Sequence, residues 1–355
     1  MKKEVLIIFL VLLIMVFVVA LWDYKTGKKM MKENTENIII ENNIINFNSL
    51  TLKQKIAQMI IVRGDESEED FTKLNMGGVH LDRQKSAEEY KEKIRNYYDN
   101  SKIKLFVTTD LEGAWTPFAG FRKEYFFPAI SEIKTKEESY EIGLKHGIVL
   151  KELGFNMNFA PIAEFEDDAY GGRVFSGTKE EIKDKLENYI RGLQENVFGV
   201  CKHYPGKGMI KNTHKRADEQ EISAEDLELF GHCFENNISA VMIGHQIVTG
   251  KINSNKKPSS VSEEVILNIP EGILVISDEV NMMGLKIFYL FNKRKLYRDL
   301  INAGENVILD FKLDSKSAYN LIEKIEKDVT EGLISEEKIN LSVKKILKAK
   351  GYELK

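Results

Sequence analysis

One stretch of the chain combines lysine, histidine and glycine residues in an order that could serve catalysis. Residues 200–214 read V-C-K-H-Y-P-G-K-G-M-I-K-N-T-H. The apolar lead-in predicts a strand that ends at Lys202 and His203, and the proline and glycines predict a loop that carries His214. In parallel α/β proteins, the loops at the carboxyl ends of the strands build the active site. The stretch indicates either catalytic side chains or a solvated turn with an incidental Lys-His pair.

Other polar residues follow other predicted strands, so we expect them at the same end of the sheet. Asp278 comes directly after the apolar run 272–276. A carboxylate at that point could act as a nucleophile or could cap a helix. The further candidates in such positions are Asp110, Glu112, Glu164 and His245.

Two of these stretches resemble motifs of a known enzyme family. Residues 202–214 resemble the K-H-[FY]-P-G-x-G-x-x-x-x-D-x-H signature of glycoside hydrolase family 3, in the branch that contains the β-N-acetylhexosaminidases. Residues 276–284, I-S-D-E-V-N-M-M-G, resemble that family's S-D-[DS]-x-x-M-x-[GA] nucleophile motif. Two motifs in the right order are much stronger than one, and the resemblance extends over residues 50–348.

The resemblance implies a retaining exo-β-N-acetylglucosaminidase that acts on terminal β-linked N-acetylglucosamine, with peptidoglycan fragments as a candidate source. Asp278 would be the nucleophile and His214 the acid/base. Such an enzyme needs a carboxylate beneath the anomeric carbon and a group that first donates and later accepts a proton. An imidazole suits the second role because its usual pKa lies near 6.5.

The resemblance also implies which residues hold the sugar. Residues 172–176, G-R-V-F-S, resemble the family's G-x-R-[SA]-[FY]-[GS] segment, and the planar fork of Arg173 suits adjacent hydroxyls or an acetamido carbonyl. His245 could contact the substrate or support the nucleophile indirectly, and we favour the second role. The implied sugar-binding residues are Asp110, Arg173, Lys202 and His203.

The chain departs from the family pattern at the acid/base. Asn212 stands where the family has an aspartate that pairs with the histidine. An analogous Asp to Asn change in a serine protease lowers the rate by about 10⁴. We therefore expect His214 to work more weakly unless Glu112, Glu164 or Asp218 supplies the missing charge.

Two further departures lie in the predicted sugar site. Ala114 and Trp115 stand in the part of the motif that holds an arginine, and Glu164 replaces an aspartate. Trp115 could stack on a sugar or pack within its loop. These changes keep two alternatives open: a catalytically impaired relative that binds amino-sugar glycans, and a phosphorylase, in which a histidine avoids the repulsion that a carboxylate would exert on phosphate.

Composition excludes several other classes of function. The 355 residues carry a formal net charge of -4 with mixed signs throughout, so no nucleic-acid partner is indicated. The histidines and cysteines lack metal-ligand spacings, and no phosphate-binding loop is present, so no cofactor is expected. The two cysteines, Cys201 and Cys233, are expected as reduced core residues.

The N-terminus predicts a membrane anchor. Residues 5–22 form an unbroken apolar run after Met1-Lys2-Lys3, long enough to cross a membrane as a slightly tilted helix. We expect an uncleaved anchor over residues 1–22, a polar tether over 23–49, and one catalytic domain over 50–355. The resemblance to exported enzymes places that domain outside the cytoplasm, as a monomer.

Strand-like and helix-like runs alternate along the domain, which predicts a single (β/α)8 barrel, with a doubly wound open sheet as the alternative. The strand-like runs are rich in Ile, Val, Leu and Met with little alternation, as in parallel strands buried on both faces. They cover residues 59–62, 78–81, 105–109, 157–161, 197–202, 240–244, 273–277 and 306–309. Helical patterns between them include 137–153, 179–195, 224–236 and 316–331.

Overall fold

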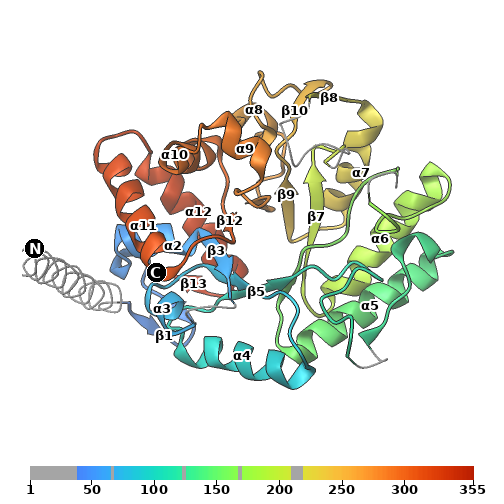
Figure 1. Cartoon of the computed structure of the whole chain (residues 1–355), viewed down its shortest axis with the longest axis horizontal. Coiled ribbons are helices and arrows are strands. Elements are labelled where there is room, and N and C mark those ends of the chain that lie inside the picture. Colours follow the sequence, from blue (N-terminus) through green and yellow to red (C-terminus); the bar gives the residue numbers. More distant parts are fainter. Residues whose placement is uncertain (1–37, 65–67, 122–124, 167–169, 209–218) are drawn as a thin grey trace, which may run out of the picture.

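The centre of the protein is a nearly closed barrel of eight parallel strands (Figure 1). The computed structural model describes residues 38–64, 68–121, 125–166, 170–208 and 219–355. In spatial order the strands are β11 (Leu274–Ser277), β9 (Ala240–Ile243), β7 (Phe198–Tyr204), β6 (Met157–Asn158), β5 (Phe106–Thr109), β4 (Gly78–His80), β3 (Ile60–Arg63) and β12 (Ile308–Asp310). Between β11 and β12 a single bridge, Ile276 to Val307, replaces a full ladder.

Each of the eight strand-like runs overlaps one of these strands, and three strands, β3, β7 and β12, extend one or two residues beyond the predicted end. All residues of β5, β9 and β11 are buried, because one face of each strand lines the barrel interior and the other packs under helices. The barrel differs from the predicted closed ring at one seam: β11 and β12 are joined by an isolated bridge and a few nearby backbone hydrogen bonds, such as that from Ser277 N–H to the carbonyl of Val307 at 2.9 Å, and not by a full ladder. The open doubly wound sheet is excluded, since β12 returns to pair with β3.

Helices surround the strands in Figure 1. Several of them have a Ser or Thr at the N-cap position; Thr178, for example, accepts a hydrogen bond from the backbone N–H of Glu181. The helices of the described residues are α2 (Leu52–Gln58), α3 (Glu68–Lys73), α4 (Ala87–Asn100), α5 (Lys136–Leu153), α6 (Lys179–Gln194), α7 (Ala224–Glu235), α8 (Glu263–Ile266), α9 (Met283–Phe288), α10 (Lys293–Ala303), α11 (Ser315–Thr330) and α12 (Glu336–Ala349).

Short strands outside the barrel join segments that are distant in the sequence. Strands β1 (Ile40–Glu41) and β2 (Ile44–Ile45) form an antiparallel pair, and β13 (Glu353–Leu354) adds to β2 in parallel. Ile45 and Phe47 are buried in the core, so residues from about 40 onward, which the sequence assigned to a polar tether, pack with the domain. On the opposite side, β8 (Glu219–Ile222) pairs with β10 (Ile247–Gly250).

The prediction of a single-pass membrane protein is corrected. Within the described part of the chain, no helix combines the length and the apolar character needed to cross a bilayer. Residues 1–22, on which the prediction of an anchor depended, lie outside that part. The fold of the described chain is therefore an α/β barrel without a membrane-spanning helix, and the placement at the cell membrane is not supported.

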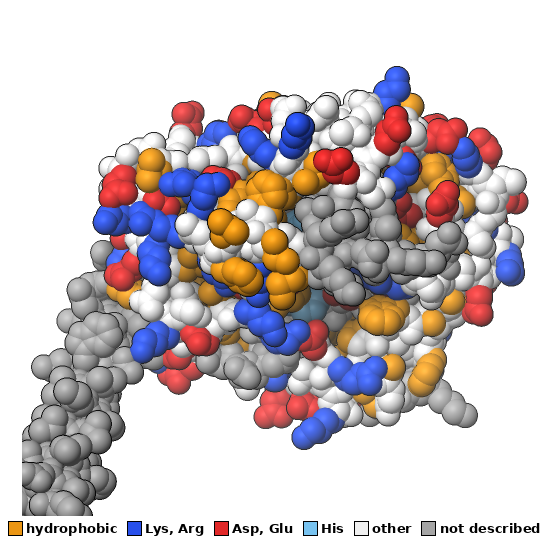
Figure 2. Space-filling view, turned by 45° about the horizontal axis from the view of Figure 1, so that its top comes forward, with side chains coloured by type: hydrophobic (Ala, Val, Ile, Leu, Met, Phe, Trp, Pro, Cys, Tyr) orange, Lys and Arg blue, Asp and Glu red, His pale blue; other side chains and the backbone are white. Residues whose placement is uncertain are grey.

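The surface of the described domain mixes charges of both signs, as the composition predicts. Figure 2 shows Lys and Arg side chains interspersed with Asp and Glu over one face of the molecule. Several of these charges form ion pairs between neighbouring helices, such as Lys183 with Glu228 at 2.6 Å. Pairs of this kind on exposed surfaces contribute at most about 1 kcal/mol each.

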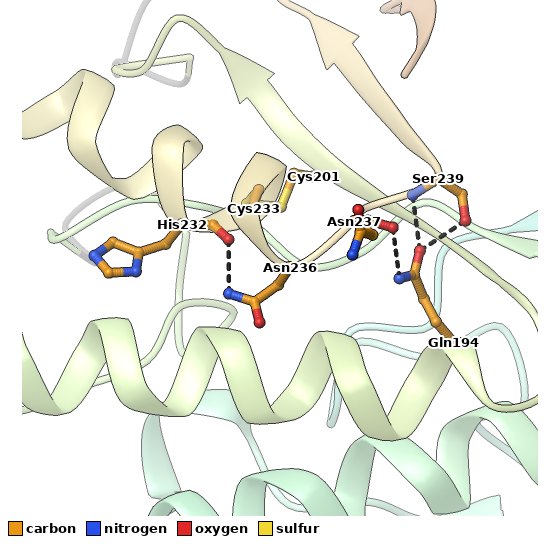
Figure 3. The surroundings of a disulfide bond; sticks show 7 residues. All are labelled: Gln194, Cys201, His232, Cys233, Asn236, Asn237 and Ser239. Atoms are coloured by element: carbon orange, nitrogen blue, oxygen red, sulfur yellow. Dashed lines mark hydrogen bonds between the residues drawn. A yellow bond between two sulfur atoms is a disulfide. The ribbon is translucent and has the colours of Figure 1, made fainter. Parts of the chain in front are cut away.

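The expectation of two reduced cysteines is wrong. Cys201 in β7 and Cys233 in α7 form a disulfide, with Cα atoms 6.6 Å apart (Figure 3). Next to it, Gln194 accepts hydrogen bonds from the backbone N–H and hydroxyl of Ser239, and donates to the carbonyl of Asn237. The bond therefore fixes α7 to the strand that carries Lys202 and His203.

We predict that reduction of this disulfide destabilises the domain. The cysteines are 32 residues apart, and closing a loop of that size in the unfolded chain stabilises the folded state by about 3 to 4 kcal/mol. Thermal unfolding with and without a thiol reductant measures the effect, and a Cys201→Ser, Cys233→Ser double variant should not respond to the reductant. Equal melting temperatures for the oxidised and reduced wild-type protein would contradict the prediction.

Candidate active site

The described residues singled out from the sequence gather at the carboxyl ends of the barrel strands. The strand register fixes their height along the barrel axis. Tyr204 and Ser277 both pair with Ile243, so the residues around the ends of β7, β9 and β11 lie side by side at the rim. Residues 209–218 lie outside the described part of the chain, so His214, Asn212 and Asp218 are not placed. The residues that are placed at the rim are Asp110, Glu112, Glu164, Arg173, Lys202, His203, His245 and Asp278.

Four of these residues form a buried cluster of charges. The Nζ atom of Lys202 lies 2.6 Å from Oδ1 of Asp110 and 2.5 Å from Oε1 of Glu112. Arg173 donates to both carboxylate oxygens of Glu112, through Nε and through Nη2 at 2.9 Å. Because the cluster holds two cations and two anions, no net charge is buried.

The cluster favours the charged forms of Lys202 and Asp110 despite their burial. The side chains of Lys202 and Glu112 are only 3% and 1% exposed. Burial alone would lower the pKa of Lys202, but the charges of Asp110 and Glu112 outweigh it and raise that pKa. Burial would raise the pKa of Asp110, and the charges of Lys202 and His80 bring it below its usual value. Asp110 remains the most accessible member, with a side chain 34% exposed, so it can accept hydrogen bonds from a ligand.

Asp278 stands on the other side of the barrel mouth. Its backbone N–H donates to the carbonyl of Ile243 in β9, and its side chain is 21% exposed. Asp278 does not cap α9, because Met282 holds the N-cap position of that helix and the side chain of Asp278 accepts a hydrogen bond from the N–H of Glu279. The carboxylate is therefore held at the strand end and stays partly exposed.

His203 lies between Asp278 and the charged cluster. Its Nε2 atom is 4.0 Å from Oδ2 of Asp278, and its Nδ1 atom has no hydrogen-bond partner within the described residues. Burial lowers the pKa of His203 to about 4, although the charge of Asp278 raises it in part. The imidazole is therefore neutral near pH 7, and can donate one hydrogen bond and accept another.

His245 holds the backbone beside Asp278. Its Nε2 atom lies 3.1 Å from the carbonyl oxygen of Glu279, which can only accept, so Nε2 carries the proton. Its Nδ1 atom then accepts from the hydroxyl of Ser260 at 2.8 Å. Burial also lowers the pKa of this histidine. His245 therefore contacts the main chain next to Asp278, through the carbonyl of Glu279.

Glu164 lies beneath the loop that begins after β7. Its Oε1 atom accepts hydrogen bonds from the backbone N–H of Gly208, at 3.1 Å, and from the hydroxyl of Tyr170, at 3.3 Å. Gly208 packs so tightly on His203 that a Cβ atom there would lie 2.6 Å from the Cβ atom of His203. Burial raises the pKa of Glu164 to about 7, partly offset by the backbone hydrogen bonds. This carboxyl group therefore ties the start of the loop to the barrel.

The structure adds a histidine that the sequence analysis did not single out. His80 ends β4, and its Nε2 atom lies 3.6 Å from Asp110 and 3.5 Å from Asp82. Its ring is stacked between Phe159 and Phe311. The sequence could have indicated His80 as a site residue, because it lies near the carboxyl end of a predicted strand, as the selected residues do.

We predict that Glu164 makes stability depend on pH. Its pKa is about 7 in the folded protein and near 4.5 when exposed, so its stabilising contribution is complete below pH 4.5 and is lost as pH rises through 7. Glu164→Gln removes this loss, which is on the order of 3 kcal/mol. Urea unfolding at pH 5 and pH 8.5 should show a smaller decrease for the variant than for the wild type.

Glu166→Gln serves as the matched control, because Glu166 is an exposed carboxylate two residues further along the same loop. Its pH dependence should follow that of the wild type. If the Glu164→Gln protein loses as much stability between the two pH values as the wild type does, the buried ionisation is not the cause.

Solved structures with the same fold include several glycoside hydrolases. A family GH3 glycosyl hydrolase from Mycobacterium smegmatis aligns with a TM-score of 0.76 at 22% identity, over 86% of this chain and 98% of that one. A β-N-acetylglucosaminidase from a Paenibacillus species aligns with a TM-score of 0.73 at 23% identity, over 85% of this chain and 62% of that one. A β-glucoside phosphorylase aligns with a TM-score of 0.73 at 19% identity, over 86% of this chain and 59% of that one. At these identities the likeness establishes the fold alone.

The family assignment comes from the sequence itself. A search of curated proteins finds no match. The pattern of the glycosyl hydrolase family 3 N-terminal domain, however, matches residues 51–349, nearly the whole of the folded chain. This span includes both motifs and every rim residue described above. The chain therefore belongs to glycoside hydrolase family 3.

Proposed function

We propose that the protein is a retaining β-N-acetylglucosaminidase that releases terminal N-acetylglucosamine, with Asp278 as its nucleophile. The observation that carries the proposal is the placement of Asp278 across the barrel mouth from the Asp110–Lys202 pair. In the ring of eight strands, β5 stands opposite β11, so a sugar bound between the two carboxylates has one edge on each. Asp278 is then the group that can approach the anomeric carbon.

The reaction has two displacement steps. A carboxylate oxygen of Asp278 bonds to the anomeric carbon while the bond to the glycosidic oxygen breaks, and that oxygen takes a proton from the acid/base. Water then gives its proton to the same group, its oxygen bonds to the anomeric carbon, and the bond to Asp278 breaks. His214 remains the proposed acid/base from the family motif.

The charged cluster supplies the groups that hydrogen-bond to the sugar. Asp110 accepts hydrogen bonds from hydroxyls, and Lys202 and neutral His203 offer donors beside it. Two donors of Arg173 bind Glu112, in addition to the direct contact with the sugar that the family motif implies. We propose that Arg173 also positions Glu112 and Lys202. The choice of an amino sugar, and peptidoglycan fragments as its source, follow the family branch that the motifs resemble.

Two alternatives have support of their own. A phosphorylase would use phosphate in place of water, and a β-glucoside phosphorylase is among the solved structures with this fold. A glycan-binding protein with little turnover would follow from Asn212, which replaces the aspartate partner of the acid/base. Phosphate-dependent formation of a sugar 1-phosphate would identify the first, and N-acetylglucosamine binding without turnover, even in an Asn212→Asp variant, would identify the second.

We predict that Asp278→Asn lowers the rate on p-nitrophenyl N-acetyl-β-glucosaminide by roughly 10³-fold or more, because an amide cannot form the glycosyl-enzyme. Release of p-nitrophenol measures the rate. Asp184→Asn is a suitable control, since Asp184 is an exposed carboxylate on α6 that should not affect turnover. Equal rates for the wild type and the Asp278→Asn variant would refute the assignment of the nucleophile.

A further inference from the structure

A pocket opens at Asp110, and both Asp110 and His80 line it. It has a volume of about 440 Å³, within the range of small-ligand sites. All of its lining residues come from two segments, 80–83 after β4 and 109–119 after β5. Neither β7, β9 nor β11 contributes to it. Because β5 stands opposite β11, a sugar with its anomeric carbon at Asp278 would have its far edge at the entrance of this pocket.

One wall of the pocket is an aromatic side chain held in a fixed turn. Trp115 is 61% exposed, an unusual exposure for a residue of its size. Its backbone pairs with that of Glu112 in both directions, at 2.9 and 3.3 Å. Gly113 between them has φ +66°, and a Cβ atom there would lie 2.5 Å from the carbonyl of Pro128, so the turn requires glycine. Arg173 covers one part of the indole, at 5.1 Å from the ring centroid.

The other wall carries polar groups suited to hydroxyls. Asp82 pairs with Arg63 at 2.8 Å, and contact with His80 keeps the pKa of Asp82 below its usual value. Asp110 shares the same histidine, so two ionised carboxylates face the pocket around one imidazole. Arg83 is an exposed donor in the same wall, with no ion pair in the described part of the chain. An exposed aromatic ring beside a few charged acceptors and a donor suits the binding of a saccharide.

From this geometry we propose that the pocket is a second sugar-binding subsite, which receives a pyranose attached to the far edge of the sugar at Asp278. The inference rests on the proposed function, and it adds to it. Removal of a single terminal residue needs only the first subsite. With the second subsite filled, the enzyme also cleaves behind a disaccharide and releases it intact.

The first products from p-nitrophenyl N,N′-diacetyl-β-chitobioside test the proposal. Cleavage with the second subsite filled gives the disaccharide and p-nitrophenol in one step, with no lag. Cleavage limited to terminal residues gives N-acetylglucosamine and p-nitrophenyl N-acetyl-β-glucosaminide first, and p-nitrophenol only later. Early disaccharide supports the subsite; its absence from the first turnovers, with the monosaccharide substrate still cleaved, overturns it.

Ala119→Phe narrows the pocket without replacing a proposed catalytic or sugar-binding residue. It should lower direct release of the disaccharide by about tenfold or more, and leave the rate on the monosaccharide substrate nearly unchanged. Arg83→Ala, at an exposed position, should weaken disaccharide release by a smaller factor. If both variants release the disaccharide as fast as the wild type, the pocket does not bind it.

Binding measurements separate this inference from the proposed hydrolysis. If neither substrate is cleaved, the proposed function fails, but the subsite still predicts that N,N′-diacetylchitobiose binds about tenfold more tightly than N-acetylglucosamine, and that Ala119→Phe abolishes the difference. Calorimetry with both sugars measures this. Equal affinities for the two sugars in the wild-type protein would overturn the subsite, whatever the activity.

Discussion

The site depends on keeping Lys202 charged inside the barrel rim. An isolated ammonium group at that depth would be strongly disfavoured, and it is retained because Asp110 and Glu112 lie against it and Arg173 balances the second carboxylate. The four residues come from β5, β7 and the segment that follows β6. Loss of one partner leaves a buried charge uncompensated, at a cost of about 3 to 5 kcal/mol. The arrangement therefore fixes three strand ends relative to one another.

This constraint divides the barrel mouth into two halves with different electrostatic character. On one side the charged cluster presents fixed donors and acceptors, which suit the hydroxyls of a sugar. On the other side Asp278 stands beside His203, whose low pKa keeps it neutral. A neutral imidazole does not form a competing ion pair with the carboxylate, so Asp278 stays available to the positive charge that develops at an anomeric carbon. His245 and Ser260 hold the adjoining main chain in place.

Local sequence pattern was sufficient for the barrel strands and for most of the rim residues. A buried parallel strand is a short apolar run, and a polar residue at or near its carboxyl end must lie at the rim, so Asp110, Lys202 and Asp278 could be found in this way. Pairings between distant segments could not be predicted from local pattern, because they depend on the register of the strands. The disulfide of Cys201 with Cys233 and the contact of Arg173 with Glu112 belong to that group. The anchor prediction used hydropathy alone, and the described helices do not support it.

The account centres on a covalent bond between Asp278 and the anomeric carbon of an amino sugar. A fluorinated N-acetylglucosaminide with a good leaving group, which forms the glycosyl-enzyme faster than water removes it, would trap that bond. Peptide mass spectrometry of the trapped protein measures where the sugar is attached. The account predicts one sugar per chain, on the peptide that contains Asp278. A sugar attached to any other residue, or turnover of the reagent without any labelled peptide, would contradict it.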